Sequence, residues 1–306
     1  MAKGVAGVRR LSRLNRGLHL LLTALPQANT GYKMIAKIAH LWGHQVLTAL
    51  FLVIGGWYLR DMLTARPLEA QTLAGTHGDR TRIMLGFRVK SEAVQAKLPT
   101  PWQLHPVHDG PLRDANFIVA LVDRVRDDDP EGRPKSRGAD RFINFVAPAK
   151  HPQTGQVASV ILGGWASNSA RVPGFFQVYR AASFRVEQVI KSQDGDAEEV
   201  TDAWEVRDTA GLGGMELRLQ SRRLMAARKR ARGEAHAISA KDPTLSQLHK
   251  FEAATDVVKS VPSGVDGVQH YTFRVSGPEY GTLFDSFTEL VGINVTAWYE
   301  RQVFVW

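Results

Sequence analysis

The segments Arg82–Val89 (RIMLGFRV) and Asn116–Asp123 (NFIVALVD) decide the fold class of this chain. Both are short, largely apolar and bounded by polar or turn-forming residues, which is typical of β-strands. The second is apolar at successive positions, so it predicts a strand buried on both faces. The segment Met215–Gln220 (MELRLQ) instead alternates apolar and polar residues, which predicts a strand with one face in water.

The rest of the chain after residue 79 continues this β-rich pattern. Turn-forming runs at residues 127–132, 152–155, 194–196 and 211–214 separate the apolar segments. Short helices are expected only at Ser91–Leu98, which Ser91 can cap, and at Pro278–Phe284. Residues 222–241 are left open as a helix or an exposed excursion. Further strands are expected at Phe142–Val146, Ala158–Leu162, Phe175–Ile190, Thr201–Arg207, Tyr271–Val275 and Arg301–Trp306.

These elements predict a mainly β fold of the α+β type. We expect a curved or closed antiparallel β-barrel with a few short helices, preceded by an N-terminal apolar helix. The period-two pattern does not separate a closed barrel from a two-sheet sandwich. The predicted organisation is a basic leader (1–37), an apolar segment (38–59), a linker (60–78) and the β-rich domain (79–306).

The apolar segment Ile38–Leu59 holds 22 residues without Lys, Arg, Asp or Glu. As a helix of about 1.5 Å per residue, it could cross a hydrocarbon core of roughly 30 Å. We favour an uncleaved transmembrane anchor over a cleaved signal segment, and a buried amphipathic helix remains the alternative. The basic leader predicts a body outside the cytoplasm, either membrane-anchored or exported to the periplasm.

The positive charge of the chain is concentrated near its N-terminus. The first 66 residues contain nine Lys and Arg and one acidic residue, or +8 of the net +9, which leaves +1 for the rest. A domain that neutralises phosphates carries its excess charge on its folded surface, so we expect no nucleic-acid partner. The chain has no cysteine, and its histidines form no HxH or HExxH pair, so no metal site and no cofactor are predicted.

The strand end Gly86-Phe87-Arg88-Val89 is followed by a short helical segment and Leu98-Pro99. This order of elements resembles the start of proteins of the acetoacetate decarboxylase-like superfamily. The segments Gly163–Ser169 and Pro173–Tyr179 lie where that family has its active-site strands. The resemblance covers roughly residues 80–306, and it implies a ligand pocket into which Arg88 reaches.

The chain departs from that family at the catalytic lysine. Decarboxylating members form a Schiff base between a lysine and a keto substrate, and the lysine is activated by desolvation or by a second cation. The matching stretch here is Arg171–Ser183 (RVPGFFQVYRAAS), and no lysine occurs between Lys150 and Lys191. The sequence therefore predicts a divergent member that lacks the Schiff-base lysine.

The remaining side chains of this region favour binding. Arg88 and Gln177 are predicted to orient a carboxylate or carbonyl, and aromatic side chains to form the walls. The predicted function is a small organic-acid or keto-compound binding protein, with lyase- or hydrolase-type activity on a small keto acid left open. The predicted binding residues are Arg88, Trp165, Phe175, Phe176, Gln177 and Tyr179, and the catalytic candidates are Tyr179 and Glu187.

Other interpretations of the same residues stay open. The aromatic residues can be plain core, with Arg88 in a surface ion pair. The alternative function is a noncatalytic carrier of an apolar or lipid-like ligand at the membrane surface, which residues 38–59 would contact. A structural envelope protein and a homo-oligomer also remain open.

Overall fold

The computed structural model describes residues 71–136, 138–193 and 197–305. This part of the chain is mainly β, with few and short helices: α2 (Ser91–Gln95) and the 3-10 turns η1 (Ser169–Arg171), η2 (Met225–Ala227), η3 (Val261–Ser263) and η4 (Gly281–Leu283). The strands are β1 (Thr72–Arg88), β2 (Gln103–Leu104), β3 (Phe117–Asp128), β4 (Asp140–Lys150), β5 (Val157–Ala166), β6 (Tyr179–Gln193), β7 (Ala197–Asp208), β8 (Gly214–Leu224), β9 (Lys229–Ser239), β10 (Ser246–Ser260), β11 (Val265–Asp266), β12 (Val268–Ser276) and β13 (Glu289–Val305).

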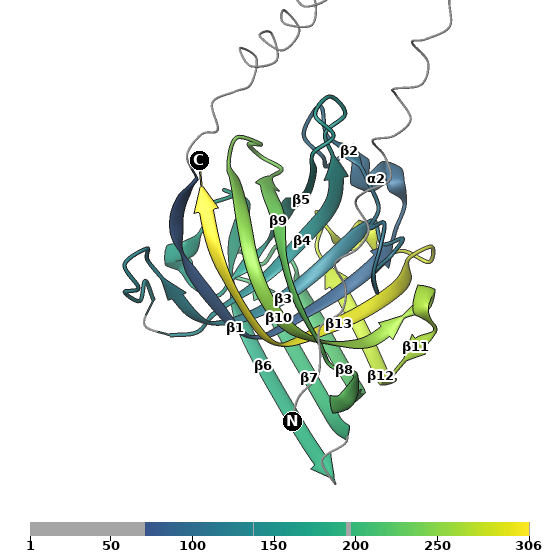
Figure 1. Cartoon of the computed structure of the whole chain (residues 1–306). Helices are drawn as coiled ribbons and strands as arrows, with labels where there is room; N and C mark the ends of the chain where they lie inside the picture. The colour runs from purple at the N-terminus through teal and green to yellow at the C-terminus, as the bar shows by residue number, and fades with distance from the viewer. Residues whose placement is uncertain (1–70, 137, 194–196, 306) are drawn as a thin grey trace, which may run out of the picture. The chain divides into compact units, whose positions relative to one another are not determined.

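The strands form one large mixed sheet whose hydrogen-bonded path returns to its own start. From β5 the path runs through β9, β10, β13, β1, β3 and β4, and β4 pairs again with β5. At Gly164–Ala166 the end of β5 also pairs with the start of β6, and the path continues through β7 and β8 to β12. Figure 1 shows β6, β7 and β8 running side by side below the curved strands of the circuit.

The strands of the circuit place alternate residues on opposite faces. In β1, Ile83 and Leu85 are fully buried in the main core, whereas Arg82 and Met84 line a cavity inside the circuit. The main core also contains Trp204 and Leu217 of the β7–β8 branch, so it fills the space between that branch and the outer face of the circuit. The stacked rings of Phe87 and Phe273, with centroids 5.1 Å apart, join β1 to β12 across this core.

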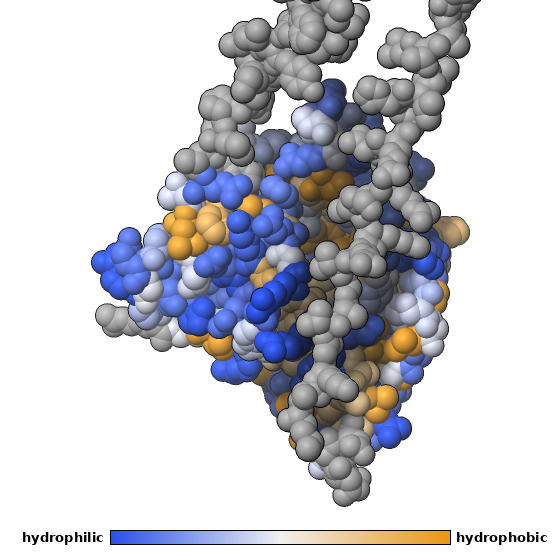
Figure 2. Space-filling model, viewed as in Figure 1, coloured by the Kyte–Doolittle hydropathy of each residue, from blue (hydrophilic) through white to orange (hydrophobic). Residues whose placement is uncertain are grey.

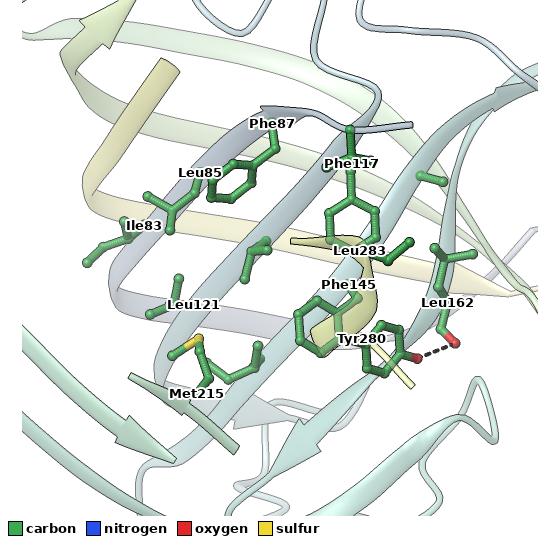
Figure 3. Close-up of a cluster of buried hydrophobic side chains, with 14 of the residues drawn as sticks. Ile83, Leu85, Phe87, Phe117, Leu121, Phe145, Leu162, Met215, Tyr280 and Leu283 are labelled. Carbon is green, nitrogen blue, oxygen red and sulfur yellow. Dashed lines mark hydrogen bonds between the residues drawn. The ribbon is translucent and has the colours of Figure 1, made fainter. Parts of the chain in front are cut away.

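The close-up in Figure 3 shows how densely this core is filled around Tyr280. The ring of Tyr280 stacks on Phe145, with centroids 4.0 Å apart, and its hydroxyl donates a hydrogen bond to the carbonyl of Leu162 at 3.0 Å. A Cβ at Gly163 would lie only 1.9 Å from that hydroxyl. Glycine at 163 is therefore required by the close approach of Tyr280.

Several sequence-based expectations need correction. The sheet is mixed and not purely antiparallel, because β5 pairs in parallel with both β6 and β9. Residues 72–78, predicted as the end of a linker, form the first part of β1 because they pair with β13 and β3. The long segment predicted from Phe175 becomes a strand only at Tyr179.

The predicted helices also change. Residues 229–239, left open as a helix or an excursion, are strand β9, since they pair with β10 along their length. Helix α2 ends at Gln95, and its N-cap is Lys90 without a side-chain cap, so Ser91 does not cap it. The predicted helix Pro278–Phe284 is reduced to the turn η4.

The apolar segment 38–59 and the rest of residues 1–70 lie outside the described residues. In the part of the chain that is described, no helix is long and apolar enough to cross a membrane. Hydrophilic residues predominate on the face of the molecule seen in Figure 2, and hydrophobic ones lie there in separate patches.

Candidate functional site

The strands of the circuit surround a cavity of about 640 Å³. Strands β1, β3, β4, β5, β9, β10 and β13 all contribute lining residues, and the segment Arg171–Tyr179 contributes others. A volume of this size falls in the range of roughly 300–1,000 Å³ that is usual for pockets that bury a small-molecule ligand.

Small side chains on β9 help to leave this space open. Three of its four lining residues are Ala231, Ala235 and Ala237. Between them, Gly233 faces the ring of Phe251, and a Cβ at 233 would lie 3.0 Å from that ring. Larger side chains here would fill the cavity, because the rest of the wall is already closely packed.

One end of the cavity carries a buried group of charges centred on Asp79. The carboxylate of Asp79 is fully buried, and it accepts hydrogen bonds from Nε of Arg82 at 3.1 Å and from Nε of Arg124 at 3.3 Å. Burial alone would raise the pKa of Asp79, but the two guanidinium groups outweigh it and lower the pKa to about 2. Asp79 is therefore ionised at neutral pH and holds both arginines against the wall.

The third arginine, Arg301, contacts two histidines instead of a carboxylate. Its Nε donates to Nδ1 of His77 at 3.1 Å, and its Nη1 lies 3.1 Å from Nδ1 of His249. A guanidinium only donates hydrogen bonds, so both Nδ1 atoms are acceptors and both rings are neutral. The protons then sit on Nε2, which in His77 faces Asp127 Oδ1 at 3.3 Å and in His249 faces Gln247 Oε1 at 3.0 Å.

The pKa shifts agree with this arrangement. Burial and the nearby charge of Arg124 lower the pKa of His77 to about 3. Burial and Arg301 lower the pKa of His249 well below its usual value. Burial, together with the like charges of Arg124 and Arg82, lowers the pKa of Arg301 to about 10, so it remains protonated at neutral pH.

The charges at this end of the cavity do not balance. Arg82, Arg124 and Arg301 carry three positive charges against one carboxylate, Asp79, which leaves an excess of two. The carboxylate of Asp127, which lines the cavity, is already matched by Arg171 at 2.7 Å and Lys135 at 4.0 Å. Burying uncompensated charge is costly, so this end of the cavity favours an anionic ligand.

The other end of the cavity is apolar. Val146, Ile161, Phe176 and Ala237 form a compact buried cluster, and all four line the cavity. Ile118 packs against the cluster from β3. The cavity therefore has a charged end and an apolar end.

Tyr179 lies between these ends and provides a hydroxyl. Its ring contacts Phe142 edge-on, and its hydroxyl donates a hydrogen bond to Oδ1 of Asn144. Burial raises the pKa of Tyr179 to about 12, so its hydroxyl stays protonated at neutral pH. Tyr179 can therefore act as a hydrogen-bonding group or a weak acid, but not as a base at neutral pH.

The structure brings three of the six predicted binding residues together at the cavity and places the others elsewhere. Phe175, Phe176 and Tyr179 line it. Arg88 is half exposed and pairs with Glu289, and Trp165 is buried in the main core with its Nε1 donating to Asp208 Oδ2 at 3.0 Å. Gln177 is exposed at a left-handed position, and the catalytic candidate Glu187 is exposed on β6.

The charged residues of the cavity were missed in the sequence. Arg82 lies in the first predicted strand, on the face opposite Ile83 and Leu85, and Arg124 directly follows the second predicted strand. The sequence gives no signal that separates Arg82 from Arg88, because both border apolar residues of the predicted strand. His77 and His249 were missed because β10 and the early part of β1 were not predicted as strands. Arg301 begins the predicted strand Arg301–Trp306, and nothing in that pattern places it at a cavity.

The comparisons with known proteins find similarity only among solved structures. No family model matches the sequence, and no curated protein matches it. The chain is similar to the enduracididine biosynthesis enzyme MppR with HEPES buffer bound, at 10% identity and a TM-score of 0.47, covering 77% of this chain and 87% of that one. It is also similar to an acetoacetate decarboxylase-like enzyme from Sphingomonas wittichii RW1, at 12% identity and a TM-score of 0.46, covering 79% and 94%.

A third similar structure is acetoacetate decarboxylase from Legionella pneumophila, at 11% identity and a TM-score of 0.43, covering 81% of this chain and 93% of that one. The solved structures to which the chain is similar thus include acetoacetate decarboxylase-like proteins, the group that the sequence also resembles. The likeness is one of fold. At these identities and TM-scores it assigns no ligand, site residue or activity to this chain.

Proposed function

We propose that this chain binds an organic anion, a carboxylate, inside the cavity, and that Arg301 is its principal partner. The observation that carries the proposal is that the guanidinium of Arg301 lines the cavity and has two neutral histidines, not a carboxylate, as its partners. Two of its nitrogens are used by His77 and His249. The hydrogen bonds that Arg301 makes to these histidines within the described residues use Nε and Nη1, so Nη2 is the nitrogen proposed to donate to a ligand. A charge-assisted hydrogen bond of this kind is among the strong ones.

Arg82 and Arg124 support the same ligand from the neighbouring strands. Asp79 accepts hydrogen bonds from Nε and Nη2 of Arg82 and from Nε of Arg124, and both arginines line the cavity. An anion placed among the three arginines would neutralise part of the excess positive charge. The planar guanidinium fits the two oxygens of a carboxylate better than an ammonium would.

We also propose that the closed circuit of pairings is the wall of a β-barrel. The path from β5 back to β5 through seven strands supports it. A barrel of about this strand number is known to hold one small ligand in its interior. In this proposal the barrel supplies the binding site, and the β7–β8 branch packs against its outer face and contributes Trp204, Val206, Met215, Leu217 and Leu219 to the main core.

A second candidate function is a noncatalytic carrier of an apolar or lipid-like ligand at the membrane surface. The apolar end of the cavity, formed by Val146, Ile161 and Phe176, favours it. The membrane-surface part of this candidate depends on residues 38–59, which remain a proposed anchor. Binding in the first candidate requires a negative charge on the ligand, whereas binding in the second does not.

The test is isothermal titration calorimetry of the full-length chain with octanoate, octan-1-ol and octyl phosphate. We expect octanoate to bind and Arg301→Gln to weaken it roughly 10- to 100-fold, since a hydrogen bond to a charged group contributes about 1.5–3 kcal/mol. The matched control Arg88→Gln removes an arginine from the surface pair with Glu289 and should leave the affinity unchanged.

Three outcomes would count against the proposal. Equal binding of octan-1-ol and octanoate would favour the carrier of uncharged ligands. Tighter binding of octyl phosphate than of octanoate would support an anion site but contradict the proposal that its ligand is a carboxylate. An Arg88→Gln effect as large as that of Arg301→Gln would move the site out of the cavity.

A further inference from the structure

The two ends of the cavity together define a class of ligand. Its charged end, with Arg82, Arg124 and Arg301, accommodates only the head of a small acid. A three- or four-carbon keto acid placed there would leave the apolar end empty or filled with water. Water is poorly held at an apolar surface that offers it few hydrogen-bonding partners.

The register of the strands shows how the ends are related. Along the paired strands β1 and β3, Arg82 pairs with Val122. Two residues further along β1, Met84 pairs with Ala120, and after two more, Gly86 pairs with Ile118. Ile118 in turn pairs with Val146, and Val146 with Ile161. The wall therefore changes from charged to apolar along the strands, within a few residues.

We infer that the ligand is an amphiphilic monocarboxylate with an extended apolar body, and that its body lies against Ile118, Val146, Ile161, Phe176 and Ala237. This inference rests on the proposed function and specifies its ligand class. The body occupies the space that the alanines of β9 leave open, and the carboxylate faces Arg301.

The polar groups near the apolar end do not favour a second charged group on the ligand. Asn144 already accepts the hydrogen bond of Tyr179, and Gln247, which pairs with Ala237, already has its Oε1 3.0 Å from Nε2 of His249. Among the described lining residues, no arginine or lysine belongs to the cluster of Val146, Ile161, Phe176 and Ala237. A dicarboxylate would place its second charge there without a cationic partner.

The inference is tested by titrating the full-length chain with straight-chain monocarboxylates from butanoate to dodecanoate. Each added methylene that becomes buried should tighten binding about fourfold, the equivalent of ~0.8 kcal/mol. The gain should continue at least to octanoate and stop where the chain fills the cavity. Suberate, the eight-carbon dicarboxylate, should bind at least tenfold more weakly than octanoate.

The variant Ala237→Leu tests whether the apolar body lies at the apolar end, because Ala237 belongs to the cluster of Val146, Ile161 and Phe176. It should weaken decanoate at least tenfold and change butanoate by less than threefold, because only the longer chain needs that space. The matched control Glu234→Leu adds the same side chain to an exposed position of the same strand, and it should leave both affinities unchanged. Circular dichroism and urea unfolding of both variants show that the fold is kept.

The outcomes separate this inference from the proposed function. Equal affinities for butanoate and decanoate, both lost in Arg301→Gln, would overturn the amphiphilic ligand and keep the anion site. Tighter binding of longer chains with no effect of Arg301→Gln would overturn the anion site. Equal effects of Ala237→Leu on short and long acids would show that the apolar body lies elsewhere.

Discussion

The guanidinium of Arg301 donates a hydrogen bond from Nε to Nδ1 of His77 at 3.1 Å, across the pair in which these residues face each other on β13 and β1. The contact fixes His77 as the neutral tautomer that carries its proton on Nε2. His249 repeats the arrangement from β10 on the other side of Arg301. An arginine is thereby positioned in the wall of a cavity without using a carboxylate that would compete with an anionic ligand.

Acid should destabilise the fold through these two histidines. In the unfolded chain a histidine binds a proton near pH 6.5, whereas the folded pKa of His77 is lowered to about 3 and that of His249 is lowered well below its usual value. The unfolded state therefore binds more protons, and the free energy of unfolding falls as the pH drops from about 6.5 toward 3. Each histidine contributes a slope of about 1.4 kcal/mol per pH unit.

Urea unfolding at pH 4.5, 5.5 and 6.5 measures this slope. His249→Gln should reduce the slope by the contribution of one histidine, about 1.4 kcal/mol per pH unit. His108→Gln should keep the wild-type slope, because His108 is exposed and does not line the cavity. A stability that does not change with pH over this range would contradict the assignment of neutral, buried histidines.

Removing the carboxylate of Asp79 should be strongly destabilising. Asp79→Asn leaves Arg82 and Arg124 without their charged partner in a buried position. Breaking a buried ion pair in this way costs about 3–5 kcal/mol. The control Glu289→Gln breaks the exposed pair with Arg88, so it should change the free energy of unfolding by less than about 1 kcal/mol. Urea unfolding compares the two, and equal losses would show that Asp79 is not a buried partner.

Gly164 should not tolerate a side chain. Its φ is +150°, and a Cβ would lie 1.8 Å from the carbonyl oxygen of Ile143 on the paired strand β4. Gly164→Ala forces β4 and β5 apart where β5 also begins to pair with β6, so we expect a loss of several kcal/mol or failure to fold. Gly155→Ala, at a surface turn with nothing near its Cβ, should cost less. Thermal unfolding of the two variants tests this difference, and similar melting temperatures would contradict it.

The sequence predicts the strands whose apolar residues follow a simple pattern. The predicted strands Arg82–Val89 and Asn116–Asp123 overlap β1 and β3 in all but one residue each, and Met215–Gln220 lies within β8. Strand β10 was missed because its apolar residues are mixed with charged ones, and β9 resembles a helix because arginine and alanine favour helices. Both segments become strands because they pair with residues far away in the sequence, and a local sequence pattern carries no information about such pairing.

The candidate site was predicted only in part. Phe175, Phe176 and Tyr179 line the cavity, whereas the arginine that faces it is Arg301, from the opposite end of the chain to the predicted Arg88. In β1, Arg82 precedes Ile83 and Arg88 follows Phe87, so both arginines border apolar residues and the sequence offers no reason to prefer one. Only the register of β1 with β13 and β3 places Arg82 inside and Arg88 at the exposed strand end.

The most direct test of the central claim is a crystal structure of the chain with 8-bromooctanoate, in which anomalous scattering locates the bromine. We expect the carboxylate within hydrogen-bonding distance of Arg301 and the bromine beside Val146, Ile161 and Phe176. A bromine found beside Arg301, or a ligand bound outside the circuit of β-strands, would contradict the account.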